Sequence, residues 1–490
     1  SLVAKTRDFL FFLFTRYIRK KKGKQKMAQK ENLKNNATRE NTAREQAAHP
    51  ENKMGVMQID KLLISMSLPM MISMLVQALY NIVDSIFVSQ INEYALRAVS
   101  LAFPIQTLMI AVSVGTAVGM NAFLSKTLGE KDFKKANTIA ENGIFIEAVS
   151  YIVFALIGIF GSAPFFASQT SIPEVREYGT TYLTICCVAG IGIFMQTTFE
   201  RLLQSTGRTI YAMITQGAGA IINLILDPVL IFGLGPFPAL GIEGAALATG
   251  LGQVLNLIIY LVIYFARPIP VRIRKTCLKP DSSMDKKLYA VGVPAILNIA
   301  LPSLLISVLN SLLAVYSQSY VVILGIYYKL QTFLYLPASG IVQGMRPVIG
   351  YNYGAREHKR VKKIYMVTLA MSSVIMIIGT VICLAVPGQL MGLFTSNAET
   401  VLAGKTALRI ISAGFLVSAV SVTGCGALEG LGKGVPSLLI SLSRYVVLII
   451  PLAFIFSRFW GAVGVWHAFW VAEALTAIFA AIIYQRSVRE

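Results

Sequence analysis

The sequence predicts an all-α polytopic membrane protein with twelve transmembrane helices in two six-helix lobes related by a pseudo-twofold axis. Three observations support this prediction: the composition, twelve apolar segments and an internal repeat. Hydrophobic residues make up 55% of the 490 residues and charged residues only 14%, whereas soluble domains carry about 25% charged residues. This composition excludes a soluble protein, and with it a nucleic-acid-binding role for the net charge of +20.

The apolar segments begin at Lys61, and each is long enough to cross a bilayer, which needs about 20 residues. Lys and Arg gather in the second, sixth and eighth connections and are absent from the fifth, seventh and ninth. Because positively charged loops stay in the cytoplasm, both termini are expected inside. The predicted segments are 61–90, 94–125, 134–162, 177–205, 209–233, 241–266, 287–312, 317–345, 361–386, 399–430, 435–457 and 461–485.

The chain divides into four predicted regions, which are a basic tail (1–53), an N-lobe (54–266), a cytoplasmic linker (267–286) and a C-lobe (287–490). The tail holds fourteen Lys or Arg against five Asp or Glu, and its polar composition predicts disorder or a surface helix. Met27 and Met54 are alternative starts, so whether the tail is native stays open.

The two lobes are predicted from an internal repeat at an offset of 225 residues. After residue 233 the offset falls to 220, so the second copy lacks five residues of a loop. Six helices is an even number, so both copies have the same orientation and the axis runs along the membrane normal. This predicts a two-lobed transporter with a cavity between the lobes. The matching pairs include Gln106 with Gln331, Gly119 with Gly344, Gly207 with Gly432 and Gly241 with Gly461.

Ionisable side chains inside membrane spans are costly, so each is a candidate functional residue. Asp84 lies late in the first segment and Asp227 late in the fifth, with Asn223 one turn before it on the same face. Thr249, early in the sixth segment, is expected at a similar depth. The pattern predicts a site for H⁺ or Na⁺ in the first lobe, and a polar knot that pins three helices together is the alternative.

The repeat supplies an internal comparison for this site. Leu309, Leu448 and Leu452 stand where the first lobe has Asp84, Asn223 and Asp227. We therefore expect the second lobe to be apolar where the first is acidic. Burial and a second carboxylate both disfavour the charged form of an acid, so such a pair can take up a proton or bind Na⁺ through several oxygens.

Three further features have two interpretations each. Glu200, followed by Arg201, is either a carboxylate that receives cations at the inner cavity mouth or one partner of a local ion pair. Pro69 is either a hinge in the first segment or a static kink, because proline removes a backbone hydrogen bond. The tyrosines of the seventh and eighth segments either line a cavity for flat organic cations or pack between helices.

The run NLILDPVLIFG from Asn223 to Gly233, followed by GIEGAALATG from Gly241, resembles the MATE family of multidrug and toxic compound extrusion transporters. The resemblance covers about 54–490 and is closest to the MepA-like and DinF-like bacterial branch. It implies a V-shaped, two-lobed antiporter that exports cationic amphipathic compounds in exchange for H⁺ or Na⁺. The functional residues that it implies are the helix-5 acid Asp227 with Asn223, the helix-1 acid Asp84, the helix-6 hydroxyl of Thr249 and the helix-4 acid Glu200.

We therefore expect a monomeric antiporter of the bacterial inner membrane that exports small organic cations by alternating access. It needs no cofactor beyond a possible Na⁺ ion. One alternative is a flippase for lipid-linked precursors, which requires a basic cavity for pyrophosphate. A more remote alternative is an intramembrane enzyme, although the sequence holds no P-loop, HExxH or GxSxG motif. The natural substrate and the choice between H⁺ and Na⁺ stay open.

Overall fold

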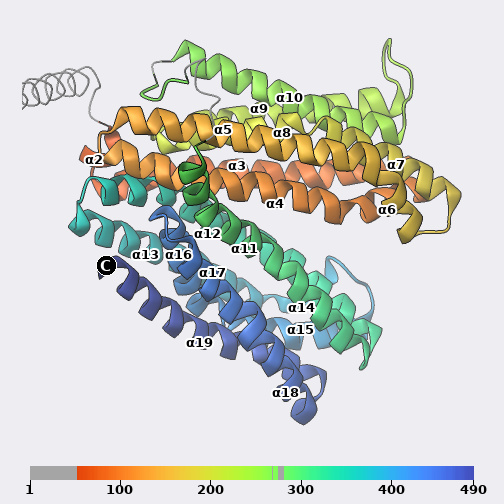
Figure 1. Ribbon diagram of the computed structural model, residues 1–490. Coiled ribbons are helices and arrows are strands. Elements are labelled where there is room, and N and C mark those ends of the chain that lie inside the picture. Colours follow the sequence, from red (N-terminus) through yellow and green to blue (C-terminus); the bar gives the residue numbers. More distant parts are fainter. Residues whose placement is uncertain (1–51, 268, 274–280, 490) are drawn as a thin grey trace, which may run out of the picture. The chain divides into compact units, whose positions relative to one another are not determined.

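The computed structural model describes residues 52–267, 269–273 and 281–489. The predictions for the basic tail and for the middle of the linker therefore lie outside the described residues. Both ends of the described chain lie at the same end of the helix bundle, near the connections that carry the basic residues (Figure 1). We call this the basic end, and the opposite one the far end.

Six spans form the first half, and a short helix, α2 (Lys53–Val56), precedes them. Two of the spans are composite, because a π-helical turn or a two-residue break interrupts them. The spans are α3 (Ile59–Ser89), α4 (Glu93–Gly129), α5–η1–α6 (Phe133–Leu156, Ile157–Gly161, Ser162–Gln169), α7–α8 (Pro173–Val188, Ile191–Ser205), α9 (Thr209–Phe232) and α10 (Ile242–Ala266).

The second half follows the same order. Its spans are α11 (Ser282–Ala314), α12 (Gln318–Gly354), α13 (His358–Ala385) with the short α14 (Pro387–Gly392), α15–α16 (Ala398–Ser412, Phe415–Gly430), α17–η2–α18 (Gly434–Leu442, Ser443–Ile449, Ile450–Trp460) and α19 (Ala462–Arg489). Within the described residues, eleven helices are long and apolar enough to cross a membrane. The pair α15–α16, bent by 54°, makes a twelfth if it is one span. The predicted fold class is therefore confirmed.

Several helices extend beyond the apolar segments that predicted them. The helices α4 and α12 continue to Gly129 and Gly354, and α11 begins at Ser282 instead of residue 287. Asp281 caps α11, because its carboxylate accepts hydrogen bonds from the backbone N–H groups of Ser283 (3.0 Å) and Met284 (3.3 Å). Hydropathy marks where a helix leaves the hydrocarbon, whereas capping and turn residues mark where it ends.

The repeat is visible in the backbone itself. Lys131 and Arg356, 225 residues apart, are the two described non-glycine residues with positive φ, at 59° and 60°. Gly207 and Gly432 share the left-handed conformation at φ 84° and 77°. The turns after α4 and α12, and those before α9 and α17, therefore have equivalent geometry in the two halves.

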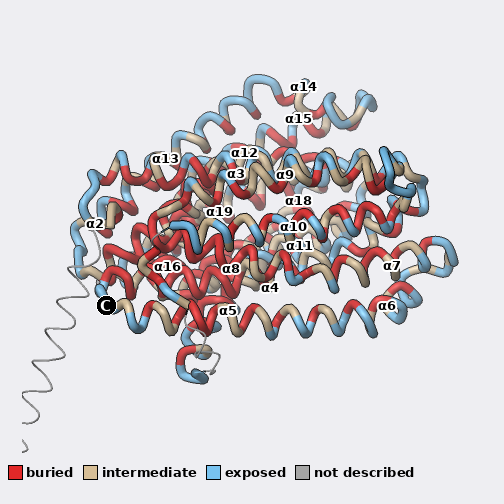
Figure 2. The backbone as a smooth tube through the Cα atoms, turned by 90° about the horizontal axis from the view of Figure 1, so that it is seen from above, coloured by how far each residue is buried: buried red, intermediate tan, exposed pale blue. Residues whose placement is uncertain are grey.

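The apolar cores show how the halves are joined. One large cluster takes buried residues from both halves, among them Leu62 and Met120 of the first and Met345 and Val348 of the second. Two further clusters, around Leu309 and around Phe166, each draw on one half alone. Buried residues are densest toward the basic end (Figure 2). A small cluster of Val118 with Val291 and Ala295 also joins the halves. The halves thus share their cores toward the basic end and keep separate cores toward the far end.

Glycines allow the backbones of the two halves to touch within the shared core. A Cβ atom on Gly344 of α12 would lie 2.6 Å from Cα of Ser67 on α3. A Cβ on Gly119 of α4 would lie 2.4 Å from the carbonyl oxygen of Leu288 on α11. Lipid is as apolar as leucine, so the hydrophobic effect does not drive helices together within a membrane. Small residues let helices approach closely and associate through van der Waals packing.

We predict that Gly344→Ala lowers the free energy of unfolding by about 1–3 kcal/mol, because the added methyl group forces α3 and α12 apart. Gly325→Ala, on the same helix, is the matched control, because nothing lies within 4 Å of its Cβ position. It should be neutral or stabilise by up to about 1 kcal/mol. Thermal unfolding in detergent measures both, and equal melting temperatures would contradict the tight contact.

Candidate functional site

Four of the predicted site residues come together toward the far end of the first half. Asn223 and Asp227 of α9 are buried, at 6% and 1% exposure, and Asp84 of α3 is half-buried. The Asp84 and Asp227 carboxyl groups are close enough to interact electrostatically. The Tyr80 hydroxyl lies beside the side chains of Asn223 and Thr249, so α3 approaches α9 and α10 at this point.

Tyr80 is a member of this group that the sequence analysis missed. It lies one helical turn before Asp84, so the two side chains share one face of α3. That spacing was the available signal, but a tyrosine in an apolar segment has many possible neighbours. We call Tyr80, Asp84, Asn223, Asp227 and Thr249 the first-half polar group.

The acceptor atoms of this group are short of donors. Both carboxyl oxygens of Asp227, Oδ1 of Asp84 and Oδ1 of Asn223 are buried without a hydrogen-bond partner. Thr249 donates its hydroxyl to the carbonyl oxygen of Ala245 on its own helix, at 3.0 Å. Buried polar atoms are nearly always paired, so four unpartnered oxygens in one place single out this group as a candidate site.

Close packing of α9 against α10 fixes the position of these side chains. A Cβ atom on Gly252 of α10 would lie 1.8 Å from Oδ1 of Asn223. Reciprocally, a Cβ on Gly219 of α9 would lie 1.9 Å from Nδ2 of Asn256 on α10. Each amide therefore fills the space above a glycine of the other helix, and this sets the rotation of α9 that places Asp227 beside Asp84.

Pro69 lies within α3, which runs without a break from Ile59 to Ser89. Proline cannot donate to the carbonyl oxygen of Ser65, four residues earlier. Thr209 of α9 donates its hydroxyl to that oxygen instead, at 3.3 Å. Polar side chains commonly satisfy carbonyls that proline frees in membrane helices. The hinge role of Pro69 stays a prediction.

Glu200 is not part of the first-half polar group and belongs to a second cluster in the shared core. It is 8% exposed and accepts a hydrogen bond from Nε2 of Gln204 at 2.7 Å. Arg201 donates to Oε1 of Gln204 at 2.8 Å and to Oε1 of Gln343 on α12 at 3.3 Å. Gln204 thus bridges Glu200 to Arg201, and Arg201 reaches into the second half. The proposed role of Glu200 in cation entry stays a prediction.

The second half contributes a paired acid to the same region. Arg346 of α12 forms an ion pair with Glu429 of α16 at 2.6 Å. Asn298 of α11 also donates to Glu429, at 2.9 Å. Unlike Asp227, Glu429 therefore has a cationic partner and a hydrogen-bond donor.

The second half is apolar at the positions equivalent to the acids of the first half, but it holds a buried ion pair elsewhere. Leu309 is fully buried in the apolar core, and Leu448 and Leu452 pack against it. Arg444 of η2 and Glu473 of α19, however, form a buried ion pair with an Nε–Oε1 distance of 2.7 Å. The expectation that the second lobe is apolar where the first is acidic therefore holds at the three repeat positions, and the Arg444–Glu473 pair lies at other positions.

Tyrosine side chains surround this ion pair. Tyr327, Tyr328, Tyr335 and Tyr445 all interact electrostatically with Arg444 and Glu473. Arg444 also lies over the ring of Tyr445, at 5.1 Å from the guanidinium carbon to the ring centre. In the first half the corresponding positions are Gly219 and Gln253, so the pair is particular to the second half. Opposite charges on neighbouring spans were the signal that the sequence offered.

With this geometry established, comparison with known proteins identifies the family. The MatE family model matches the chain twice, over residues 69–229 and 294–455. The chain belongs to the MatE family. The two matches begin 225 residues apart, which is the offset of the repeat.

Relatives of this MatE chain include proteins named as multidrug export proteins. It is 26% identical over 430 residues to the multidrug export protein MepA of Staphylococcus haemolyticus, covering 87% of this chain and 93% of the relative. The MepA protein of a Staphylococcus aureus strain is also 26% identical, over 428 residues. A solved structure described as the outward-facing conformation of a multidrug resistance MATE family transporter superposes with a TM-score of 0.83. It covers 89% of this chain and 97% of its own, at 23% identity.

We predict that replacing one residue of the Arg444–Glu473 pair lowers the free energy of unfolding far more than replacing both residues. Glu473→Ala leaves the guanidinium buried without its partner, which should lower the free energy of unfolding by about 3–5 kcal/mol. Replacing both residues by leucine should cost much less, because no uncompensated charge remains. A double-mutant cycle on thermal unfolding measures the coupling, and additive losses would show that the two side chains do not depend on each other.

Proposed function

We propose that this multi-pass membrane protein is a secondary antiporter that exports small organic cations in exchange for H⁺ or Na⁺. The observation that carries the proposal is the first-half polar group, whose two carboxyl groups leave buried oxygens without a donor. Membership of the MatE family and similarity to multidrug export proteins support export as the direction of transport.

The chemistry of coupling follows from charge. Two ionised carboxylates in apolar surroundings repel each other and lack hydrogen-bond donors, so a proton or a Na⁺ ion stabilises them. Loading the ion removes net charge from the first half and favours one packing of α3, α9 and α10. An organic cation favours the other packing, so the two ligands exclude each other and exchange across the membrane.

The two halves pack together at the basic end and have separate cores toward the far end, which supports alternating access. Because the halves share their cores only toward the basic end, the structure corresponds to a state closed at that end. If positive loops face the cytoplasm, the closed end is the inner one, and the first-half polar group faces outward. Opening inward then requires the halves to part at the basic end and to join at the far end.

The competing functions have weaker support. A flippase for lipid-linked precursors needs unpaired positive charge to hold pyrophosphate, yet Arg444 and Arg346 are both paired with glutamates. The first-half polar group is acidic, which favours a cationic ligand. An intramembrane enzyme needs a positioned nucleophile and base. Glu429 and Glu473 are paired with arginines instead, and Asp84 and Asp227 lie with an amide and hydroxyls.

We expect Asp227→Asn to abolish ion-driven export, because an amide can neither release a proton nor carry the charge that Na⁺ requires. The measurement is ethidium movement in proteoliposomes under an imposed pH gradient and then under a Na⁺ gradient. Glu243→Gln is the matched control, since Glu243 is an exposed acid in the first turn of α10. It should retain wild-type transport.

The transport assay identifies the coupling acid, the coupling ion and the class of transported compound. Transport that is lost only in Asp227→Asn identifies the coupling acid, and the gradient that drives the wild type identifies the ion. Full ion-driven export by the folded Asp227→Asn variant would overturn the proposal. If the wild type moves no ethidium under either gradient, lipid-linked precursors become the next cargo to assay.

We predict that Tyr80→Phe weakens coupling without abolishing it. The variant loses the hydroxyl beside Asn223 and Thr249, which we expect to link α3 to α9 and α10 during transport, while both carboxyl groups remain. The initial rate of ion-driven export should fall about tenfold, as expected for the loss of about 1.4 kcal/mol of hydrogen bonding. Tyr94→Phe, at an exposed tyrosine in the first turn of α4, should have no effect. A Tyr80→Phe rate equal to the wild type would exclude the linking role.

A further inference from the structure

The short helix α2 lies between the two halves at the basic end, where it contacts both. In the first half, Nδ2 of Asn52 donates to the carbonyl oxygen of Thr206, in the turn between α8 and α9, at 3.3 Å. In the second half, Nδ2 of Asn352 donates to the carbonyl oxygen of Met54 at 2.9 Å. One turn of helix therefore bridges elements that belong to different halves.

Arg360 of α13 strengthens the contact with the second half. Its guanidinium donates to the carbonyl oxygens of Met54 (3.3 Å) and Met57 (3.0 Å), at the C-terminal end of α2. Its Nε also donates to Oδ1 of Asn352 at 2.8 Å, which orients that amide toward α2. A cation beside the carbonyl end of a helix is favourably placed.

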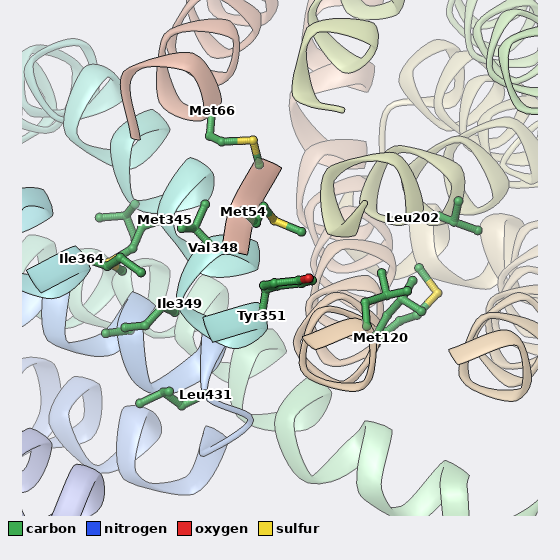
Figure 3. Close-up of a cluster of buried hydrophobic side chains, with 14 of the residues drawn as sticks. Met54, Met66, Met120, Leu202, Met345, Val348, Ile349, Tyr351, Ile364 and Leu431 are labelled. Atoms are coloured by element: carbon green, nitrogen blue, oxygen red, sulfur yellow. The ribbon is translucent and has the colours of Figure 1, made fainter. Parts of the chain in front are cut away.

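Met54 anchors this segment in the shared core. Its side chain is completely buried, and it lies among residues of both halves, such as Met66, Met345 and Tyr351 (Figure 3). Gly55 permits the approach, since a Cβ atom there would lie 3.1 Å from the ring of Tyr351. Burying a methionine side chain contributes about 1.5–3 kcal/mol, so the segment is held by apolar burial as well as by hydrogen bonds.

The repeat shows that these partners are specific to this contact. Lys135 stands in the first half where the second half has Arg360, and it pairs with Glu130 at 3.5 Å instead. Thr127 stands in place of Asn352. The residues that hold α2 are therefore not a general feature of a MatE half, and the contact is asymmetric.

We propose that Asn52–Met57 is a latch that holds the basic end closed. Its partners lie on both halves, so all of its contacts can exist together only while those halves are joined. The basic end cannot open until the segment leaves its place on at least one half. This inference rests on the proposed alternation between two states, and it adds a segment outside the membrane spans that sets the balance between them.

The test measures opening at the basic end without any substrate. Ser67, fully buried where α3 meets α12, is replaced by cysteine in the full chain after the native cysteines are changed to alanine. The rate of labelling by a fluorescent maleimide is measured on detergent-purified protein. Arg360→Ala should raise this rate about tenfold, and Asn52→Ala, which frees α2 from the first half, should raise it similarly.

Two controls keep the result interpretable. Lys359→Ala removes a neighbouring, exposed positive charge on the same helix and should leave the labelling rate unchanged. A cysteine at Val315, which is 81% exposed, should label equally fast in every variant, and thermal unfolding confirms that each is folded. Wild-type labelling of Ser67→Cys in folded Arg360→Ala and Asn52→Ala would overturn the latch. Because labelling needs no transport, failure of ion-driven export would be recognised separately.

Discussion

Direct backbone contact between the two halves at the basic end is the constraint on which the rest of the structure depends. Gly119 lets α4 approach α11, and Gly344 lets α12 approach α3, more closely than any larger residue would allow. With the basic end fixed in this way, the halves keep separate cores toward the far end. The first-half polar group lies on the far-end part of α3 and α9, where packing against the second half does not hold it.

The two halves share a backbone plan but differ in their buried charge. In the first half, both oxygens of Asp227 and Oδ1 of Asp84 are buried without a hydrogen-bond donor. In the second half, Arg444 and Glu473 neutralise each other. A bound cation therefore changes the net charge of the first half alone. Under the proposed function, this asymmetry would let an ion act on the first half while the second half keeps its charge balance.

Most of the fold could be predicted from the sequence, because hydropathy and the 225-residue repeat are local and periodic signals. The position of Asp227 near Asp84 was also predictable, since depth in a membrane follows from residue count along a helix. The sequence did not predict the role of Tyr80, the Arg444–Glu473 pair or the position of α2 between the two halves. Each depends on helix rotation or on contacts between distant segments, such as Asn352 with Met54. A one-residue change of helix phase, about 100°, would separate such partners.

Cation loading of the first-half polar group should control which end of the protein is open. The most direct measurement is the distance between spin labels on Tyr94 and Val315, both exposed toward the far end of different halves. A second label pair on Lys134 and Lys359 reports the basic end. We predict that acid pH or Na⁺ shifts the two distances in opposite directions, and that Asp84→Asn with Asp227→Asn removes the response. Distances that do not respond in the wild type, or that still respond in the double variant, would contradict this account.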